Sequence, residues 1–407
     1  MIAMQRTIGF VVGRLLPAAF LFLAVSIGWL SRSEVPAGKF FATVIPLMSG
    51  TLPPTIVGHG KMSGTPVVPD DMMPQPRPDN EILLDLPSGD KLPASTSDST
   101  FARCSAQQRN LSRFMYAYSS DGIGMCCRAT AYDDVLVYRT VLWYLLLGGR
   151  HIDGAHLYLN HKAIGKGINE AVKRGVARRE IFFTTKIFPT QFGYESTLQN
   201  VEQYLDQTKQ DYIDLVLLHF PSVSAFGPML SSPCSKEGKS ARECRIETWK
   251  ALSELQASGK IRNAGVSNFA VKHLKDLEGI GVPIANNQIQ FNPFEPEYVV
   301  ETFKYCAANG ITITAYSPLG GLMDRSKAEA SEILLDLSHK YDRRLTSIML
   351  RWAIQRGCAV IPGTGNPSHM LSNLAVYDFE LSDEDMSIIN NLKNVVKGFN
   401  MDVREID

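Results

Sequence analysis

Four side chains that can exchange protons or carry charge lie within one stretch of the chain: Asp153, Tyr158, Lys186 and His219. Hydride reduction of a carbonyl requires a proton for the developing alkoxide and hydrogen-bond donors that stabilise its charge. Tyrosine is a weak acid near neutral pH unless a nearby cation favours its phenolate. We therefore predict that Tyr158 donates the proton and that Lys186 is this cation. Asp153 can pair with Lys186 in a partly dry site, and His219 can donate a hydrogen bond to the substrate oxygen.

Each of these residues alone also has a structural explanation. Asp153 can cap a helix, and Tyr158 can be a packed surface aromatic residue. Lys186 can lie along an apolar surface, and His219 can be a hydrogen-bonded core histidine. For any single residue this explanation is the stronger one. The four together are harder to explain in this way, because a strand that enters water does not have to end in Asp, Lys or His.

Short apolar runs typical of strands alternate with segments of helical period after Gly122, a pattern that predicts parallel βα units. The helical segments include residues 196–207, 247–260, 297–310 and 347–357. The strand-like runs are Gly122–Cys127, Gly149–Ala155, Glu180–Ile187, Tyr212–Phe220, Ile261–Phe269, Ile284–Phe291, Ile311–Leu319 and Cys358–Thr364. Eight such strands predict a closed (β/α)8 TIM barrel over residues 122–407. The alternative, a doubly wound open sheet, would want a G-x-G-x-x-G turn between a strand and a helix, and the repeat has none.

Polar residues stand at the carboxyl ends of several of these strands, and in a closed barrel those ends converge on one mouth. They are Asp153, Lys186, His219, Ser267, Asn268, Gln288 and Tyr316. The fold prediction and the chemical prediction therefore place the same residues in one site.

Composition favours a small-molecule enzyme. The 41 basic residues are balanced by 41 acidic ones, so no net field recruits nucleic acid or an anionic membrane surface. The seven cysteines have no CxxC or Cys/His ligand spacing, so we expect no metal site. Cys234 and Cys244 share one loop and can pair in an oxidising compartment, but we favour free thiols. We expect a monomer.

The first 121 residues lack the regular alternation of strand-like and helical segments that follows Gly122. Residues 1–32 contain the apolar run Leu15–Leu30, which is compatible with a signal peptide, a signal anchor or the start of a plastid leader, and we favour an uncleaved anchor. We therefore expect entry into the secretory pathway or an organelle, with a membrane tether through this run. Residues 33–80 have the composition of a disordered linker, and residues 81–94 show the pattern of a β-hairpin, with two short strand-like pieces around a Ser-Gly turn.

Seven motifs in this order resemble the aldo-keto reductase family, and specifically its branch of xylose and aldose reductases. They are HIDGAHLYLNHKAIGKGI, FFTTKIF, DYIDLVLLHFP, GKIRNAGVSNF, NNQIQFNPF, AYSPLGG and LRWAIQRGCAVIPGT, and LPSGDKLPA resembles the hairpin that closes the barrel bottom in that family. The resemblance implies a (β/α)8 barrel that binds a nicotinamide cofactor, usually NADPH, across its mouth without a Rossmann motif. In that family the hairpin runs almost directly into the first strand, so the resemblance makes residues 95–121 an insertion.

Residue by residue, the resemblance makes Asp153, Tyr158, Lys186 and His219 a catalytic tetrad. It implies that Ser267, Asn268 and Gln288 hold the nicotinamide carboxamide and that Tyr316 stacks on the nicotinamide ring. The other expected cofactor contacts are Ser317, Leu319 and Gly320 at the pyrophosphate, together with Thr364 and Asn373. The expected substrate contacts are Phe188, Phe220 and Cys126.

Several positions depart from the family pattern. Met125 and Cys126 replace a Thr and an aromatic residue at the end of the first strand, which widens the substrate pocket. His161 replaces a Glu, so we expect a different contact on the cofactor side. Gly363 and His369 stand where a Lys and an Arg usually grip the 2′-phosphate, which leaves the choice between NADPH and NADH open.

The sequence thus predicts an NAD(P)H-dependent reductase of aldehydes or ketones with Tyr158 as general acid. The alternative, from a different class, is a membrane-tethered, non-catalytic regulatory subunit that uses the barrel to bind nicotinamide. The complete tetrad favours the enzyme, whereas the N-terminal apolar run favours the subunit.

Overall fold

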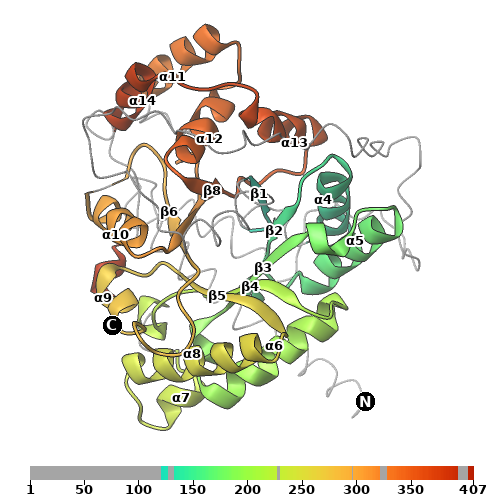
Figure 1. The fold of residues 1–407 in the computed structure, drawn as a ribbon, viewed down its shortest axis with the longest axis vertical. Helices are drawn as coiled ribbons and strands as arrows, with labels where there is room; N and C mark the ends of the chain where they lie inside the picture. Colours follow the sequence, from blue (N-terminus) through green and yellow to red (C-terminus); the bar gives the residue numbers. More distant parts are fainter. Residues whose placement is uncertain (1–120, 127–132, 227–229, 296, 321–327, 393–401) are drawn as a thin grey trace, which may run out of the picture. The chain divides into compact units, whose positions relative to one another are not determined.

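The computed structural model describes residues 121–126, 133–226, 230–295, 297–320, 328–392 and 402–407, and eight parallel strands form its centre (Figure 1). The strands are β1 Gly122–Gly124, β2 His151–Asp153, β3 Phe182–Ile187, β4 Ile213–Leu218, β5 Ile261–Ser267, β6 Asn286–Gln290, β7 Thr312–Tyr316 and β8 Cys358–Val360. Each strand pairs with the next in sequence order, and a parallel bridge between Asp121 and Val360 joins the first strand to the last. The predicted (β/α)8 barrel is confirmed.

Helices lie around these strands, as the alternation predicts (Figure 1). The α-helices are α4 Asp134–Leu146, α5 His161–Lys173, α6 Tyr194–Thr208, α7 Pro233–Lys236, α8 Ala241–Ala257, α9 Val271–Lys275, α10 Glu297–Ala308, α11 Ala328–Tyr341, α12 Leu345–Gln355, α13 Pro367–Leu374 and α14 Asp383–Asn390. The short 3₁₀ turns are η4 His156–Tyr158, η5 Arg178–Glu180, η6 Pro189–Gln191, η7 Val223–Phe226, η9 Ala375–Tyr377 and η10 Val403–Glu405. Capping residues set several helix starts: Ser240 and Glu243 form a capping box on α8, and Asn366 caps α13 ahead of a proline.

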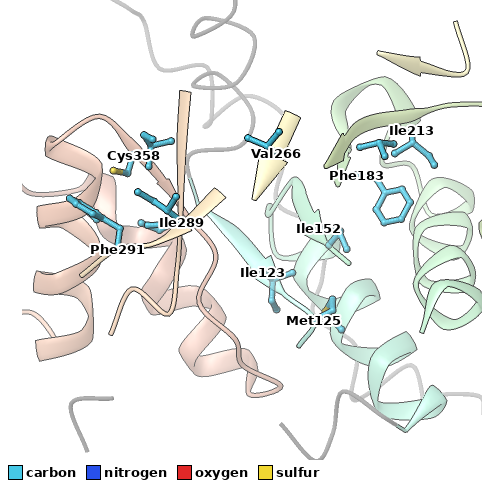
Figure 2. Packing of buried hydrophobic residues seen from close by; sticks show 14 of the residues in the cluster. Ile123, Met125, Ile152, Phe183, Ile213, Val266, Ile289, Phe291 and Cys358 are labelled. Atoms are coloured by element: carbon cyan, nitrogen blue, oxygen red, sulfur yellow. The ribbon is translucent and has the colours of Figure 1, made fainter. Parts of the chain in front are cut away.

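The two faces of each strand meet different surroundings. Phe183 on β3 and Val216 on β4 belong to the large apolar cluster between sheet and helices, shown in part in Figure 2. Their neighbours Phe182 and Leu215 form a separate cluster with Leu217. This alternation is the two-residue period of a strand, with one face turned outward to the helices and the other into the barrel.

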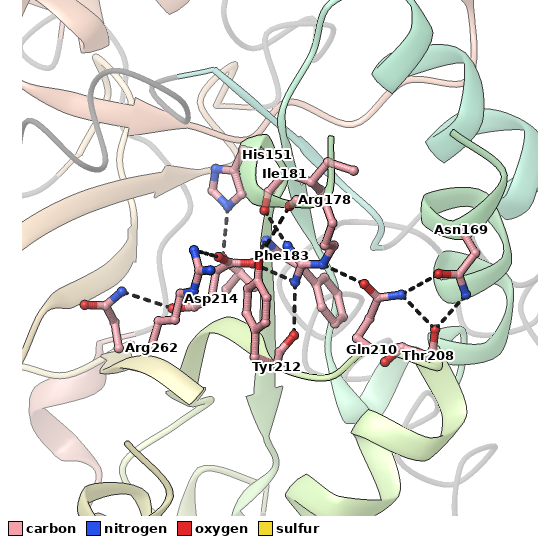
Figure 3. Close-up of polar contacts among 12 residues, drawn as sticks. His151, Asn169, Arg178, Ile181, Phe183, Thr208, Gln210, Tyr212, Asp214 and Arg262 are labelled. Carbon is pink, nitrogen blue, oxygen red and sulfur yellow. Dashed lines mark hydrogen bonds and ion pairs between the residues drawn. The ribbon is translucent and has the colours of Figure 1, made fainter. Parts of the chain in front are cut away.

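A polar cluster occupies the amino ends of strands β2 to β5 (Figure 3). Asp214 is almost completely buried there, and its carboxylate contacts Arg178 at 2.9 Å and Arg262 at 3.4 Å. Both guanidinium groups lie over the Tyr212 ring, 4.1 and 3.8 Å from its centroid. Arg178 also donates to Gln210 at 2.6 Å. These contacts join the amino ends of neighbouring strands at the end of the barrel away from the mouth.

The prediction of free thiols is wrong for one pair of cysteines. Cys234 and Cys244 form a disulfide, with Cα atoms 5.6 Å apart, because the first turns of α7 and α8 lie against each other. Cys126 is also disulfide-bonded, whereas Cys306 and Cys358 are free and buried.

The predicted anchor, linker, hairpin and insertion, residues 1–32, 33–80, 81–94 and 95–121, lie outside the described residues except for Asp121. Within the described part of the chain, no helix has the length and apolar character needed to cross a membrane.

Candidate active site

The predicted mouth residues stand at inward-facing positions near the carboxyl ends of successive strands. Asp153 is the last residue of β2, Lys186 is next to last in β3, and His219 directly follows β4. Ser267 ends β5 and is paired with Gln288 in β6, and Gln290, two residues further on, is paired with Tyr316 at the end of β7. The two-residue period turns these positions into the barrel together with the inner-cluster residues Leu215 and Leu217.

A buried ion pair forms the floor of the mouth. The Lys186 Nζ donates to Asp153 Oδ1 at 2.5 Å and to the Gly154 carbonyl at 2.9 Å. Gln288 Nε2 donates to the other oxygen of Asp153 at 2.7 Å, so each oxygen of this carboxylate has a donor. Burial lowers the pKa of Lys186, and Asp153 opposes that shift. A pair so deeply buried persists only with such complete hydrogen bonding.

Tyr158 lies above this pair on the 3₁₀ turn η4. The Lys186 Nζ is 5.1 Å from the centroid of its ring, and the His219 ring meets it edge to face at 5.8 Å. Leu159, the next residue, has a φ of 56°, the left-handed conformation that costs a residue with a side chain roughly 1 kcal/mol or more. The four predicted residues Asp153, Tyr158, Lys186 and His219 therefore come together at one mouth.

The environment of His219 keeps its imidazole neutral. Burial lowers its pKa well below the usual value, and the charge of Lys186 adds to this effect. A neutral imidazole can still donate one hydrogen bond. Phe220 stacks on the His219 ring at 5.1 Å and Phe188 meets it edge to face at 6.0 Å. The polar mouth thus has an aromatic wall on the side of β3 and β4, where both phenylalanines were predicted to contact substrate.

The residues predicted to hold the nicotinamide form a connected patch on β5 to β7. Asn268 Nδ2 donates to the His219 carbonyl at 2.9 Å, and its Oδ1 accepts from the Tyr316 hydroxyl at 2.7 Å. Ser267 Oγ donates to the Gln288 carbonyl at 2.9 Å. Asn268 has a φ of 62°, a conformation that Asn tolerates better than most residues. The patch adjoins Asp153 through Gln288.

The predicted phosphate-side residues occupy two neighbouring loops. Ser317, Leu319 and Gly320 form a tight turn after β7, in which Gly320 N donates to the Ser317 carbonyl at 2.9 Å. Gly320 has a φ of 53°, and a Cβ there would meet Asn292 Oδ1 at 2.6 Å, so only glycine fits.

Helix α13 and the loop before it carry the remaining predicted cofactor residues. Thr364 Oγ1 lies 3.5 Å from His369 Nδ1, and Asn373 belongs to the same helix. Arg344, the residue before α12, donates to Ser368 Oγ at 3.3 Å. A cation that sequence reasoning missed therefore stands beside the first turn of α13.

One expectation at the mouth needs correction. His161 does not lie on the cofactor side: its Nε2 contacts Thr185 Oγ1 at 2.6 Å and its ring stacks on Tyr204, on the helix-facing side of β3. The reason is that residue 161 begins α5, which packs against that outer face. Cys126 lies two residues after β1 and is disulfide-bonded, and its contact with substrate stays a prediction.

Comparison with known proteins identifies the family. The model of the aldo/keto reductase family matches residues 122–394, the whole barrel up to the end of α14. The chain belongs to the aldo/keto reductase family. It is an NAD(P)H-dependent oxidoreductase of that family, and nothing in the described residues or in these similarities favours a membrane-tethered regulatory subunit.

Relatives of this aldo/keto reductase are named as reductases. It is 36% identical to the glyoxal reductase of Bacillus subtilis over 248 residues, which covers 60% of this chain and 79% of the relative. It is 33% identical to an NADPH-dependent D-xylose reductase of Meyerozyma guilliermondii over 300 residues, 68% of this chain and 92% of the relative. A Bombyx mori aldo-keto reductase solved in complex with NADP has 28% identity and a TM-score of 0.57, over 67% of this chain and 89% of that one.

Proposed function

We propose that this aldo/keto reductase reduces aldehydes or small ketones with NADPH or NADH, and that Tyr158 is its proton donor. The carrying observation is the position of the Tyr158 ring, 5.1 Å from the Lys186 ammonium and edge to face with the neutral His219 ring. A cation at this position favours the phenolate that remains after the proton has left.

The residues at the mouth fit a nicotinamide cofactor. Two amide side chains, Asn268 and Gln288, lie beside the serine hydroxyl of Ser267 and the aromatic ring of Tyr316. Amides and hydroxyls complement a carboxamide, and an aromatic ring can stack on a pyridine ring. The bound nicotinamide supplies a hydride to the carbonyl carbon.

Side chains of the protein then orient the substrate's carbonyl oxygen and supply its proton. His219 donates a hydrogen bond from its neutral ring and orients the carbonyl, while Tyr158 transfers its proton as negative charge grows on that oxygen. Lys186, held by Asp153 and by the Gly154 carbonyl, stabilises the phenolate. Phe188 and Phe220 exclude water from one side, which strengthens these interactions. Their position favours substrates with an apolar or aromatic group next to the carbonyl.

Three single substitutions test this assignment. Tyr158→Phe removes one oxygen and keeps the ring, so turnover of an aldehyde panel should fall by about 10² to 10⁴ while cofactor binding survives. Lys186→Met should be similarly slow, since the phenol then loses its cation. His219→Gln should retain more activity because an amide also donates a hydrogen bond.

The assay is steady-state reduction of the panel with both cofactors, alongside cofactor binding by fluorescence quenching. Wild-type turnover in Tyr158→Phe would show that another group is the acid. A wild-type protein that binds cofactor and reduces no aldehyde would contradict the proposed reaction.

A further inference from the structure

A second hydrogen-bonded cluster lies behind the mouth, between the turn that carries Tyr158 and helix α6. Its centre is Gln191, the last residue of the 3₁₀ turn η6 that follows Phe188. None of its members belongs to the tetrad or to the predicted cofactor contacts. It therefore needs its own explanation.

The side-chain amide of Gln191 uses its full hydrogen-bonding capacity. Its Nε2 lies 3.0 Å from His156 Nδ1 and donates to Asn200 Oδ1 at 2.5 Å. Its Oε1 accepts from the Tyr204 hydroxyl at 2.9 Å and from the Phe188 backbone N–H at 3.3 Å. A primary amide has two donors and two acceptor sites, so all four are occupied.

These partners determine which of the two terminal atoms of the Gln191 amide is the oxygen and which is the nitrogen. The backbone N–H of Phe188 can only donate, so the atom that faces it must be the oxygen of Gln191. The nitrogen then faces His156, whose Nδ1 must accept. Burial lowers the pKa of His156 to about 4, which agrees with a neutral ring that accepts at this nitrogen.

The four partners belong to three separate elements. His156 shares the turn η4 with Tyr158, Phe188 lies between β3 and η6, and Tyr204 and Asn200 belong to α6. Helix α6 is a stable reference because Tyr204 is completely buried and Asn200 Nδ2 is bonded to the Ser196 carbonyl at 2.7 Å. Through Gln191, this helix is connected to both the proton donor's turn and the substrate wall.

The turn η4 needs such support. Leu159 closes it in the left-handed conformation, which is unfavourable for leucine, and a three-residue turn has little internal hydrogen bonding of its own. On the mouth side, Lys186 holds the Gly154 carbonyl just before the turn. On the opposite side, His156 and Gln191 make the corresponding contact.

We propose that Gln191 is a positioning residue for reduction, which sets the orientation of Tyr158 through His156 and the place of Phe188 through its backbone. This inference rests on the proposed role of Tyr158. Gln191 touches neither the substrate nor the cofactor in this arrangement, because its amide is completely engaged behind the mouth.

The central test is Gln191→Met, which keeps the approximate volume and removes all four hydrogen bonds. We expect kcat for aldehyde reduction to fall by about tenfold or more, because small displacements of a reacting group are costly in rate. KM should rise modestly through Phe188. Cofactor affinity should stay within about twofold, because the predicted nicotinamide contacts lie on β5 to β7.

The matched control is Gln210→Met. Gln210 is another glutamine with side-chain hydrogen bonds to several elements, at 2.6 Å to Arg178 and 2.8 Å to Asn169, but it belongs to the cluster at the other end of the barrel (Figure 3). Gln210→Met should lower Tm as much as Gln191→Met does and leave kcat within about twofold of the wild-type value. A purely structural Gln191 would behave like this control, and that result would overturn the proposal.

A second variant separates positioning from stability. Gln191→Glu keeps both acceptor sites and can accept a hydrogen bond from His156, whose ring can present an N–H at Nδ1. It introduces a partly buried carboxyl group and should lower Tm more than Gln191→Met while retaining more of kcat. The reverse order, with kcat following Tm, would overturn the proposal.

Should Gln191→Met fail to fold, His156→Leu breaks the link from the side of the turn alone, and unchanged kcat in that variant would overturn the proposal. A different result would refute the proposed function. If Tyr158→Phe kept wild-type turnover, Tyr158 would not be the proton donor, and the role assigned to Gln191 would be refuted as well. Loss of turnover in Tyr158→Phe with normal turnover in Gln191→Met would refute only the positioning role.

Discussion

Removing the guanidinium group of Arg178, which lies at the amino ends of the strands, should destabilise the barrel. Asp214 is 1% exposed, and Arg178 is the nearer of its two cations, at 2.9 Å against 3.4 Å for Arg262. Arg178→Met keeps an unbranched apolar side chain and leaves the carboxylate with Arg262 and one backbone donor, the Phe183 N–H. Breaking one side of a buried ion pair costs about 3 to 5 kcal/mol, and the remaining partners place the expected loss near about 3 kcal/mol.

The stability lost in Arg178→Met should depend on pH, because the Asp214 carboxylate can be protonated in the variant. Burial already raises the pKa of this carboxyl in the folded state, while Arg178 opposes the shift. Because the pKa of Asp214 is raised in the folded state, the contribution of this carboxyl group to stability is lost as pH rises through that pKa. Arg178→Met removes a neighbouring cation and raises the folded-state pKa of Asp214 further. Protonating an ordinary carboxyl costs about 4 kcal/mol at pH 7 and about 1.5 kcal/mol at pH 5. The difference between wild type and variant should therefore shrink on acidification.

Urea unfolding at pH 7 and pH 5 measures this difference. The matched control is Arg179→Met, since Arg179 belongs to the same 3₁₀ turn and is exposed, and it should cost less than about 0.5 kcal/mol. A loss in Arg178→Met no larger than in the control would refute the structural role of the pair. A large loss that is equal at both pH values would refute the electrostatic explanation.

Three further predictions concern other parts of the molecule. Cys234→Ser opens the disulfide to Cys244 and should cost about 2 to 3 kcal/mol, measured by thermal unfolding with and without a dithiol reductant, which should destabilise the wild type by more than the variant because Cys126 is disulfide-bonded in both. Burial raises the pKa of Asp121 from 3.8 to about 8, so its stabilising contribution is lost progressively as pH rises between these two values. Asp121→Asn should flatten the stability profile between about pH 4 and 8, and an unchanged slope would contradict this. Gly363→Lys adds a cation beside His369 and should raise the ratio of NADPH to NADH affinity about tenfold or more in fluorescence titrations; an unchanged ratio would place the 2′-phosphate elsewhere.

The number and order of the strands could be predicted from the sequence because they depend on local patterns. Each strand is a short apolar run of residues that favour strands, and each is followed by a segment of helical period. The same two-residue period fixes which side chains face inward, so Asp153, Lys186 and Gln288 could be assigned to the mouth once the barrel was assumed. The family motifs gave these positions their expected roles.

Contacts between distant segments could not be predicted in this way. Cys234 and Cys244 pair because two helix starts pack together, and nothing in their spacing distinguishes a bonded pair from two thiols. His161 reads as a replacement at the mouth, yet the first turn of α5 turns it to the outer face of β3. Gln191 and His156 are 35 residues apart and meet only because η4 and η6 follow neighbouring strands.

The sequence by itself therefore determined the barrel and the inward set of polar residues, because strand and helix periods are properties of a few consecutive residues. The tertiary structure alone decided the disulfide, the surroundings of His161, the link through Gln191, and the placing of Arg344 beside α13. Each of these depends on how helices and loops pack over the sheet. That packing is set by the sum of many weak contacts across the whole core, which no single motif encodes.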